Sequence, residues 1–232
     1  MSKTFSVTRN GVALDPSLYN WDENTRSFST NEDDLVIDFS YWNGVTFTTG
    51  YGCTFDTGCD CTFKTGNSCT FDTGYGCTFD TGYGCTFDTG FGCTFTTGNS
   101  CTFYTGYGCT FRSGCDCTFK TGSDCTFMTG PYCIFNTSHS CTFDTSYGCT
   151  FSTRQSCTFK TGSECVIVRR DVFEVIQLEP NVTIKLNGCG VKGYSFAKLY
   201  SFVENKYVIT VDGKEIELSQ ESFNNLKNQL CS

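Results

Sequence analysis

The chain has 232 residues and a net charge of −8, with 16 Lys and Arg residues, 24 Asp and Glu residues and a single histidine. The basic residues are dispersed, so no stretch is basic enough to follow a phosphate backbone, and we expect no nucleic-acid surface. The sequence lacks both an apolar run long enough to span a bilayer and, in its first residues, the apolar core of a signal peptide, which favours synthesis in a cytosol without export.

Residues 1–44 predict a β-rich cap. Asn10-Gly11 is a strong hairpin signal, and the stretch from Asp22 to Thr25 has the composition of a second turn. The predicted strands around these two turns are Phe5–Thr8 with Val12–Leu14, and Leu18–Trp21 with Arg26–Ser29. A further strand at Leu35–Phe39 leads into the next segment.

Three aromatic residues of this cap are candidates to cover the end of the repeats. Tyr41 and Trp42 are placed to cover the first unit of the segment that follows, and Trp21 belongs to the second predicted hairpin. An alternative is that Trp21 and Trp42 stack on a sugar. We favour capping, because the end of a repeat array exposes core side chains and an unpaired strand edge.

Residues 45–164 consist of fifteen tandem repeats of an octapeptide with the pattern Cys-Thr-Phe-x-Thr-Gly-x-x. Cysteine occupies every eighth position from Cys53 to Cys165, and phenylalanine occupies the third position of each unit from Phe47 to Phe159. The first five positions are rich in β-branched and aromatic residues and predict a strand, whereas Gly-x-x is typical of a turn. A short fixed period indicates an array in which each unit buries the apolar face of its neighbours.

The variable fourth position shows which face of each strand is outside. Strand side chains alternate between faces, so Cys, Phe and the fifth-position Thr share one face, and the second and fourth positions share the other. Charges of both signs at the fourth position indicate solvent, so Cys and Phe must lie inside. The fourth-position residues are Thr48, Asp56, Lys64, Asp72, Asp80, Asp88, Thr96, Tyr104, Arg112, Lys120, Met128, Asn136, Asp144, Ser152 and Lys160.

A single strand with one apolar face is not stable, so the octads predict an all-β fold, a β-solenoid. Two octads in each coil would give a flattened roll of two sheets about 36 Å long, and three would give a triangular section about 24 Å long, at about 4.8 Å for each coil. We favour two octads in each coil, because facing Phe and Cys side chains suit the gap of about 10 Å between packed sheets. The turn residues do not decide between the two.

The 19 cysteines have three possible explanations: packed thiols, disulfides or metal sites. Stacked parallel strands hold their cysteines in a poor geometry for disulfides, and free cysteine packs well as a small apolar group, so we expect reduced core thiols. Zinc is disfavoured by the lack of paired C-x-x-C motifs and by the single histidine, His139. Cys59 and Cys115 precede Cys61 and Cys117 in predicted turns. That position permits exposure to solvent, but we favour the interpretation that they fill the turns.

The repeat becomes irregular toward its end, and residues 165–190 predict further coils with an aliphatic interior, so that the solenoid spans 45–190. Residues 191–232 predict a small α+β module, with a hairpin around Asp212-Gly213 and a helix from Ser219 to Leu230. One face of that helix, made of Phe223, Leu226 and Leu230, is the candidate attachment surface. The alternative is that this face packs on the last coil.

The candidate surface of the repeats is a ladder of outward second-position threonines. Nothing in the sequence assembles a catalytic site, a metal site or a cofactor site, so we expect a non-enzymatic protein. The threonines of the ladder are Thr54, Thr62, Thr70, Thr78, Thr86, Thr94, Thr102 and Thr110.

The octads of residues 45–164 resemble those of uncharacterised repeat proteins of phages and large viruses. The resemblance implies a structural or adhesive virion component, a stiff rod whose partners are other structural proteins of the particle or further copies of itself. The octads also loosely resemble the Thr-Cys-Thr repeats of insect antifreeze proteins, which implies ice binding, although charged residues adjoin the threonines here. A third possibility is a cytoplasmic scaffold or inhibitor similar to the pentapeptide-repeat proteins that mimic DNA, but the charge is weak and mixed for that role.

Overall fold

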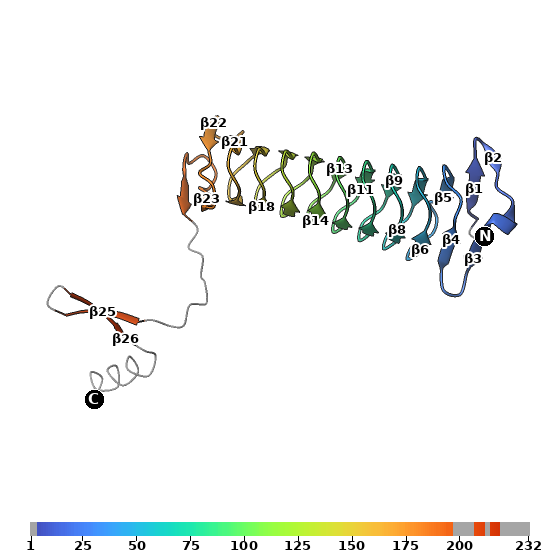
Figure 1. Ribbon diagram of the computed structural model, residues 1–232, viewed down its shortest axis with the longest axis horizontal. Coiled ribbons are helices and arrows are strands. Elements are labelled where there is room, and N and C mark those ends of the chain that lie inside the picture. The colour runs from blue at the N-terminus through green and yellow to red at the C-terminus, as the bar shows by residue number, and fades with distance from the viewer. Residues whose placement is uncertain (1–3, 197–206, 212–213, 219–232) are drawn as a thin grey trace. The chain divides into compact units, whose positions relative to one another are not determined.

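The computed structural model describes residues 4–196 in full and residues 207–211 and 214–218 at the level of their strands. The chain divides into two units, residues 1–197 and residues 198–232. In the first unit the described residues form a β-solenoid of about nine turns, built from two sheets of 12 strands each (Figure 1). A 3-10 helix, η1 (Pro16–Leu18), lies between β2 and β3.

Sheet A takes every second strand of the repeats and has antiparallel strands at both ends. In spatial order it contains β2 (Val12–Ala13), β1 (Ser6–Arg9), β5 (Val36–Phe39), β7 (Thr54–Thr57), β9 (Thr70–Thr73), β11 (Thr86–Thr89), β13 (Thr102–Thr105), β15 (Thr118–Lys120), β17 (Ile134–Asn136), β19 (Thr150–Thr153), β21 (Val166–Arg169) and β22 (Glu174–Gln177). The strands from β5 to β21 are parallel to one another.

Sheet B takes the other strands and is closed in the same way. In spatial order it contains β3 (Tyr19–Asp22), β4 (Ser27–Thr30), β6 (Thr46–Thr48), β8 (Thr62–Lys64), β10 (Thr78–Asp80), β12 (Thr94–Thr96), β14 (Thr110–Ser113), β16 (Thr126–Thr129), β18 (Thr142–Thr145), β20 (Thr158–Lys160), β23 (Thr183–Leu186) and β24 (Tyr194–Phe196). The strands from β4 to β20 are parallel to one another.

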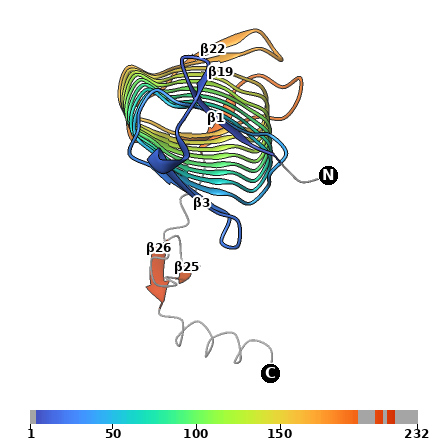
Figure 2. The same ribbon diagram turned by 90° about the vertical axis from the view of Figure 1, so that its right-hand side faces the viewer.

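Each coil contains two octads, as predicted. Phe79 pairs with Phe63 on one side and with Phe95 on the other, and both partners are 16 residues away in sequence. Viewed along the stack, the coils superimpose as a flattened loop with one sheet on each side (Figure 2). The three-octad alternative is therefore excluded.

The core confirms the predicted assignment of faces. The third-position phenylalanines and first-position cysteines of the octads are at most 1% exposed. Within a sheet successive rings stack face to face, as for Phe79 and Phe95 at 4.8 Å and 3°. Between sheets the rings meet edge to face, as for Phe79 and Phe87 at 5.2 Å and 75°. Both are favoured arrangements of aromatic pairs, so the same ring contacts repeat along the whole phenylalanine stack, beside the buried cysteines.

The Gly-x-x positions form the corners between the two sheets. A Cβ atom on Gly90, a sixth-position glycine, would lie 2.9 Å from the backbone nitrogen of Tyr75 in the preceding coil. The eighth position is left-handed at each corner of the repeats, whether it is a glycine such as Gly92 (φ 68°) or another residue such as Ser100 (φ 58°). Successive coils approach closely at the sixth position, and the chain turns at the eighth.

The N-terminal end contains the two hairpins predicted around Asn10-Gly11 and around residues 22–25, as β1–β2 and β3–β4. β1 pairs antiparallel with β5, while β4 and β5 already pair parallel with the first repeat strands, so the parallel stack begins before residue 45. Trp42 is buried, and the centre of its ring lies 5.1 Å from that of the Trp21 ring. The prediction for Tyr41 is wrong: a turn closed by the bond from Trp42 N–H to the Phe39 carbonyl leaves Tyr41 75% exposed.

The C-terminal end of the first unit differs from the further coils predicted for residues 165–190. β21 continues the parallel stack, but β22 and β23 pair antiparallel with β21 and β20. Ile176 and Ile184 on these two strands are buried, so the predicted aliphatic interior is present. The predicted coils are not, because both strands run antiparallel to the strands they pair with. Residues 191–196, assigned from sequence to the C-terminal module, include β24, which pairs with β23.

In the second unit, β25 (Tyr207–Val211) and β26 (Lys214–Leu218) form the predicted antiparallel hairpin. The predicted helix from Ser219 to Leu230 lies outside the described residues.

Candidate functional site

The second-position threonines point outward, but they lie in two columns on opposite sheets because successive octads alternate between the sheets. Sheet A carries Thr54, Thr70, Thr86 and Thr102, and sheet B carries Thr62, Thr78, Thr94 and Thr110. On sheet A the column is interrupted by Ile134. On sheet B it is unbroken from Thr46 to Thr158.

The fourth-position residues of sheet A begin with an acidic column. Asp38, Asp56, Asp72 and Asp88 pair in register on successive strands. Partial burial raises the pKa of the Asp56 carboxyl, and the charges of Asp38 and Asp72 raise it further. Like charges placed directly opposite one another destabilise a sheet.

Sheet B carries a mixed column at the same position. Asp80 is paired with Lys64, and Asp144 accepts a salt bridge of 3.1 Å from the ammonium group of Lys160. The charges of this column alternate in sign or are separated by neutral residues, in contrast to the acidic column of sheet A. The two outer faces of the solenoid therefore differ in their electrostatics although they share one repeat.

An exposed aromatic column lies at the corner where the chain passes from sheet A to sheet B. The rings of Tyr75 and Phe91 stack at 4.9 Å and 6°, and those of Phe91 and Tyr107 at 4.9 Å and 4°. These side chains are 42–56% exposed. These residues are not among the sites predicted from the sequence, although their spacing of 16 residues at the seventh octad position is the signal that identifies them.

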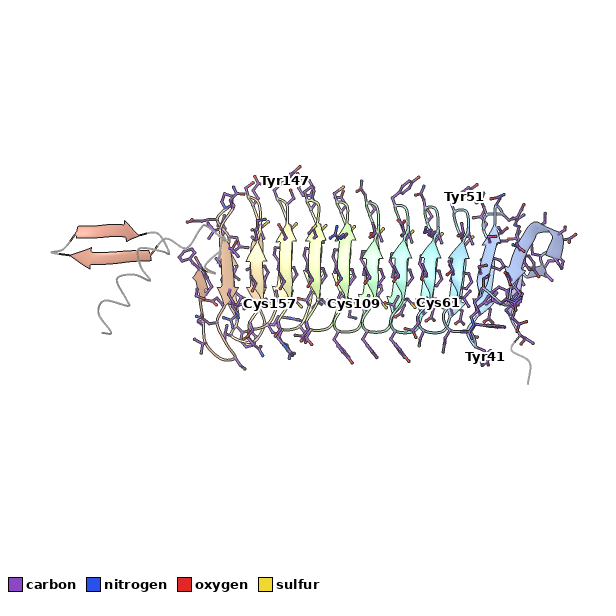
Figure 3. The ribbon with its side chains drawn as sticks, turned by 90° about the horizontal axis from the view of Figure 1, so that it is seen from below. Tyr41, Tyr51, Cys61, Cys109, Tyr147 and Cys157 are labelled. Carbon is purple, nitrogen blue, oxygen red and sulfur yellow. The ribbon has the colours of Figure 1, made fainter. Side chains whose placement is uncertain are left out.

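The opposite corner, where the chain passes from sheet B to sheet A, carries no comparable face-to-face stack over its described residues, because asparagine, cysteine or proline separates its seventh-position tyrosines. Asn67 lies between the coils of Tyr51 and Tyr83, and its side-chain oxygen accepts from the Tyr83 backbone N–H at 3.1 Å. Figure 3 places Tyr51 and Tyr147 on this edge, and Tyr41 on the other.

A hollow of about 400 Å³ opens on sheet A beside the aromatic column. The hollow is lined on sheet A by Asp88, Tyr104 and Lys120, which occupy the fourth octad position on three neighbouring strands. The Lys120 ammonium nitrogen lies 5.8 Å from the centre of the Tyr104 ring. The remaining lining residues belong to the corner: Thr89, Thr105, Thr121 and Gly122.

The repeat cysteines form two internal columns, one along each corner, and are free and buried. The Sγ atom of Cys77 lies 3.7 Å from the carbonyl oxygens of both Gly58 and Tyr75, which is a weak hydrogen-bonding environment for a thiol. Burial raises the pKa of the Cys53 thiol. Figure 3 shows Cys61, Cys109 and Cys157 along one edge.

Among the residues that the structure describes, three further cysteines lie outside these columns. Cys59 and Cys115 lie in corners and are half-buried, and Cys189 is exposed in the loop before β24. Among the residues that the structure describes, no group of three or more His, Cys, Asp or Glu side chains is arranged to hold a metal ion. The predicted attachment residues Phe223, Leu226 and Leu230 lie outside the described residues.

A buried arginine closes the last coil. Arg169 is fully buried and forms a salt bridge of 2.7 Å with Asp171 and a second of 3.7 Å with Glu174. The same guanidinium donates to the carbonyls of Val191 at 2.7 Å and Gly193 at 3.1 Å. These contacts hold the loop before β24 against the last coil.

The described segments contain no helix with the length and apolar character needed to cross a membrane. Comparisons with family models, with curated proteins and with solved structures find no match for this chain.

Proposed function

We propose that this protein is a non-enzymatic structural rod of a particle such as a virion, and that it holds a contact surface away from its point of attachment. The observation that carries the proposal is the unbroken, in-register stack of parallel strands from β4 to β21, in which each strand is hydrogen-bonded on both sides. A stack of this kind resists bending and stretching, because either motion breaks ladder hydrogen bonds and separates stacked rings.

The repeated chemistry of the outer faces supports a presenting role. Active sites bring a few unlike groups together in one concave place, whereas most of the solenoid surface repeats threonine and one variable residue in each strand. One departure from this monotony on the described sheet faces is the hollow lined by Asp88, Tyr104 and Lys120. Attachment through the C-terminal unit remains a prediction from sequence.

Mass spectrometry of purified particles tests the proposal. If the protein is a virion component, its tryptic peptides from residues 53–169 should copurify with the major structural proteins through a density gradient, in constant ratio across the particle peak. Recovery of the protein only in the soluble cytosolic fraction would contradict the proposal and favour the alternative of a cytoplasmic scaffold.

A truncation tests the attachment. Because residues 191–196 pair with the solenoid end, the deletion that separates the two units removes residues 198–232 and leaves β24 in place. The truncated chain should retain the far-UV circular dichroism of a β-solenoid and no longer copurify with the particle. If the truncated chain still copurifies, attachment lies on the N-terminal end or on the faces of the sheets.

Ice binding is a second candidate, favoured by the unbroken threonine column of sheet B from Thr46 to Thr158. The adjacent column argues against it, since Lys64, Asp80 and Arg112 interrupt any regular array of hydroxyl and methyl groups. The intact protein should inhibit ice recrystallisation if this alternative is correct, and replacing Thr94 with Lys should abolish the inhibition. No inhibition by the intact protein would exclude this alternative.

A further inference from the structure

We infer that the hollow bounded by Asp88, Tyr104 and Lys120 binds a neutral oligosaccharide. The inference rests on the proposed function and names a ligand class for the surface that the rod presents. At this hollow, three neighbouring strands place a carboxylate, an aromatic ring and an ammonium group side by side.

The geometry follows from the repeat of 16 residues. Asp88, Tyr104 and Lys120 project from β11, β13 and β15 at the same level of the sheet, so they form a row parallel to the stacking axis. The corner residues, including Gly122, present small side chains or none and leave the hollow beside that row. The hollow is shallow and open to solvent, with a volume of about 400 Å³.

The chemistry of the row matches a sugar ring. A pyranose has apolar C–H groups on its faces and hydroxyl groups around its rim. The Tyr104 ring, 45% exposed, offers an apolar surface for the C–H groups. The Asp88 carboxylate accepts hydrogen bonds from hydroxyls, and the Lys120 ammonium donates to their oxygens. Because the two charges sum to zero, the row favours a neutral sugar over an acidic one.

Other ligand classes fit this surface less well. A peptide that adds a strand needs an unpaired sheet edge, and β11, β13 and β15 are paired on both sides. A phosphate backbone needs a track of basic residues, and Lys120 adjoins Tyr104 in a row that begins with Asp88. A divalent cation needs several oxygen ligands, whereas the hollow contains a single carboxylate.

The aromatic column extends the surface along the solenoid. Phe91 and Tyr107 stand three residues after Asp88 and Tyr104, at the adjacent corner, and are 42% and 56% exposed. Their rings stack at 4.9 Å, so the apolar strip continues across successive coils. An oligosaccharide of several residues lying along the axis would contact the row and this strip together, which favours a chain over a single monosaccharide.

Saturation-transfer difference NMR on the full-length protein tests the inference, with maltoheptaose, cellohexaose, chitohexaose and the acidic 3′-sialyllactose as probes. At least one of the three neutral oligosaccharides should receive saturation at or below about 10 mM, the weak end of specific binding. Tyr104→Ala should weaken its binding at least about tenfold, and Lys120→Ala should weaken it to a smaller extent, through loss of one charge-assisted hydrogen bond.

Two control variants distinguish binding at this site from nonspecific binding elsewhere on the surface. Tyr83→Ala removes an exposed tyrosine from the opposite corner, and Lys64→Ala removes an exposed fourth-position lysine from sheet B. Both should bind the sugar within about twofold of the unmodified chain. Circular dichroism of each variant checks its fold, and Tyr104→Phe, which keeps the ring, should retain binding.

The inference is overturned if none of the neutral oligosaccharides binds, if only sialyllactose binds, or if the control variants lose as much affinity as Tyr104→Ala. The particle experiment is independent of these results. Loss of sugar binding in a Tyr104→Ala chain that still copurifies with particles would support both proposals, and a protein that binds sugar but is absent from particles would overturn only the proposed function.

Discussion

Phe79 shows what a single repeat residue contributes. Its ring is 1% exposed and stacks at 4.9 Å on Phe63 and at 4.8 Å on Phe95, while Phe71 and Phe87 meet it edge to face from the other sheet. The ring is therefore held on four sides by other rings. Truncation leaves a cavity that its neighbours cannot fill without breaking their own stacks.

Phe79→Ala should accordingly lower the free energy of unfolding by about 3–5 kcal/mol, the usual cost of removing a buried ring. Asp80→Asn is the matched control, because the next residue faces solvent and should change the same quantity by no more than about 0.5 kcal/mol. Urea titration followed by circular dichroism measures both. Equal losses in the two variants would contradict the alternation of faces.

The corner glycines are needed for two different reasons, which substitutions can separate. At Gly90 a Cβ atom would collide with the backbone of Tyr75, whereas at Gly92 it would meet nothing within 4 Å and would only be disfavoured by the φ of 68°. Gly92→Ala should cost about 1–2 kcal/mol, the strain of a left-handed residue. Gly90→Ala should cost more, because two coils must also separate, and thermal unfolding of both variants would show the order. The reverse order would contradict close packing at the sixth position.

At the scale of the element, the aspartates of the acidic column of sheet A repel one another across neighbouring strands. The folded state raises the pKa of Asp56, first by burial and then through Asp38 and Asp72. A carboxyl whose pKa is higher in the folded state than in the unfolded state binds more protons when folded, so its contribution to stability decreases as the pH rises through that pKa.

Asp56→Asn should therefore stabilise the protein at pH 7, by about 0.2–1 kcal/mol for relief of like charges on adjacent strands. The gain should disappear as the pH falls below the ordinary aspartate pKa of 3.8, where the column is protonated. Asp80→Asn on sheet B, which removes the partner of Lys64, should not stabilise at either pH. Thermal unfolding at the two pH values checks this, and a gain at Asp56 that is independent of pH would exclude charge repulsion as its cause.

The cysteine columns are elements of the core, and their reactivity should follow their burial. Cys77, Cys85 and Cys93 are at most 1% exposed, so a thiol reagent should reach them only after unfolding. Cys189 is exposed and should react at once, which makes it an internal control. Peptide mapping after timed labelling distinguishes the sites. Rapid native labelling of Cys77, or its recovery in a disulfide, would contradict a core of reduced thiols.

At the scale of the first unit, stability depends on how the ends are closed. Antiparallel strands bound both sheets, and at the C-terminal end Arg169 joins the last coil to the loop before β24. Removing one partner of a buried ion pair leaves the other charges uncompensated.

Arg169→Met should lower the free energy of unfolding on the order of 3–5 kcal/mol and should increase amide exchange in β21 and β23 before it affects the central coils. Arg112→Met, in the exposed column of sheet B, should change the free energy by no more than about 0.5 kcal/mol. Exchange that rises equally throughout the solenoid in the Arg169 variant would mean that the end does not open separately.

The sequence by itself determined the β-solenoid, the inward cysteines and phenylalanines, the outward threonines and the hairpin at Asn10-Gly11. Each of these depends on local rules, namely the alternation of side chains along a strand and the backbone preferences of turn residues, which act within one octad or one hairpin. Tyr41 was misjudged because a turn closed by the bond from Trp42 N–H to the Phe39 carbonyl leaves it exposed to solvent.

Only the tertiary structure decided which side chains are neighbours. An eight-residue period is compatible with two or three octads in each coil, and the choice of two places Asp88, Tyr104 and Lys120 in one row and Tyr75, Phe91 and Tyr107 in another. It also decided that β22 and β23 run antiparallel to the strands they pair with, and that Arg169 contacts a loop about 20 residues away in sequence. Contacts across coils depend on the number of residues in each turn, a property of the closed coil that no single octad encodes.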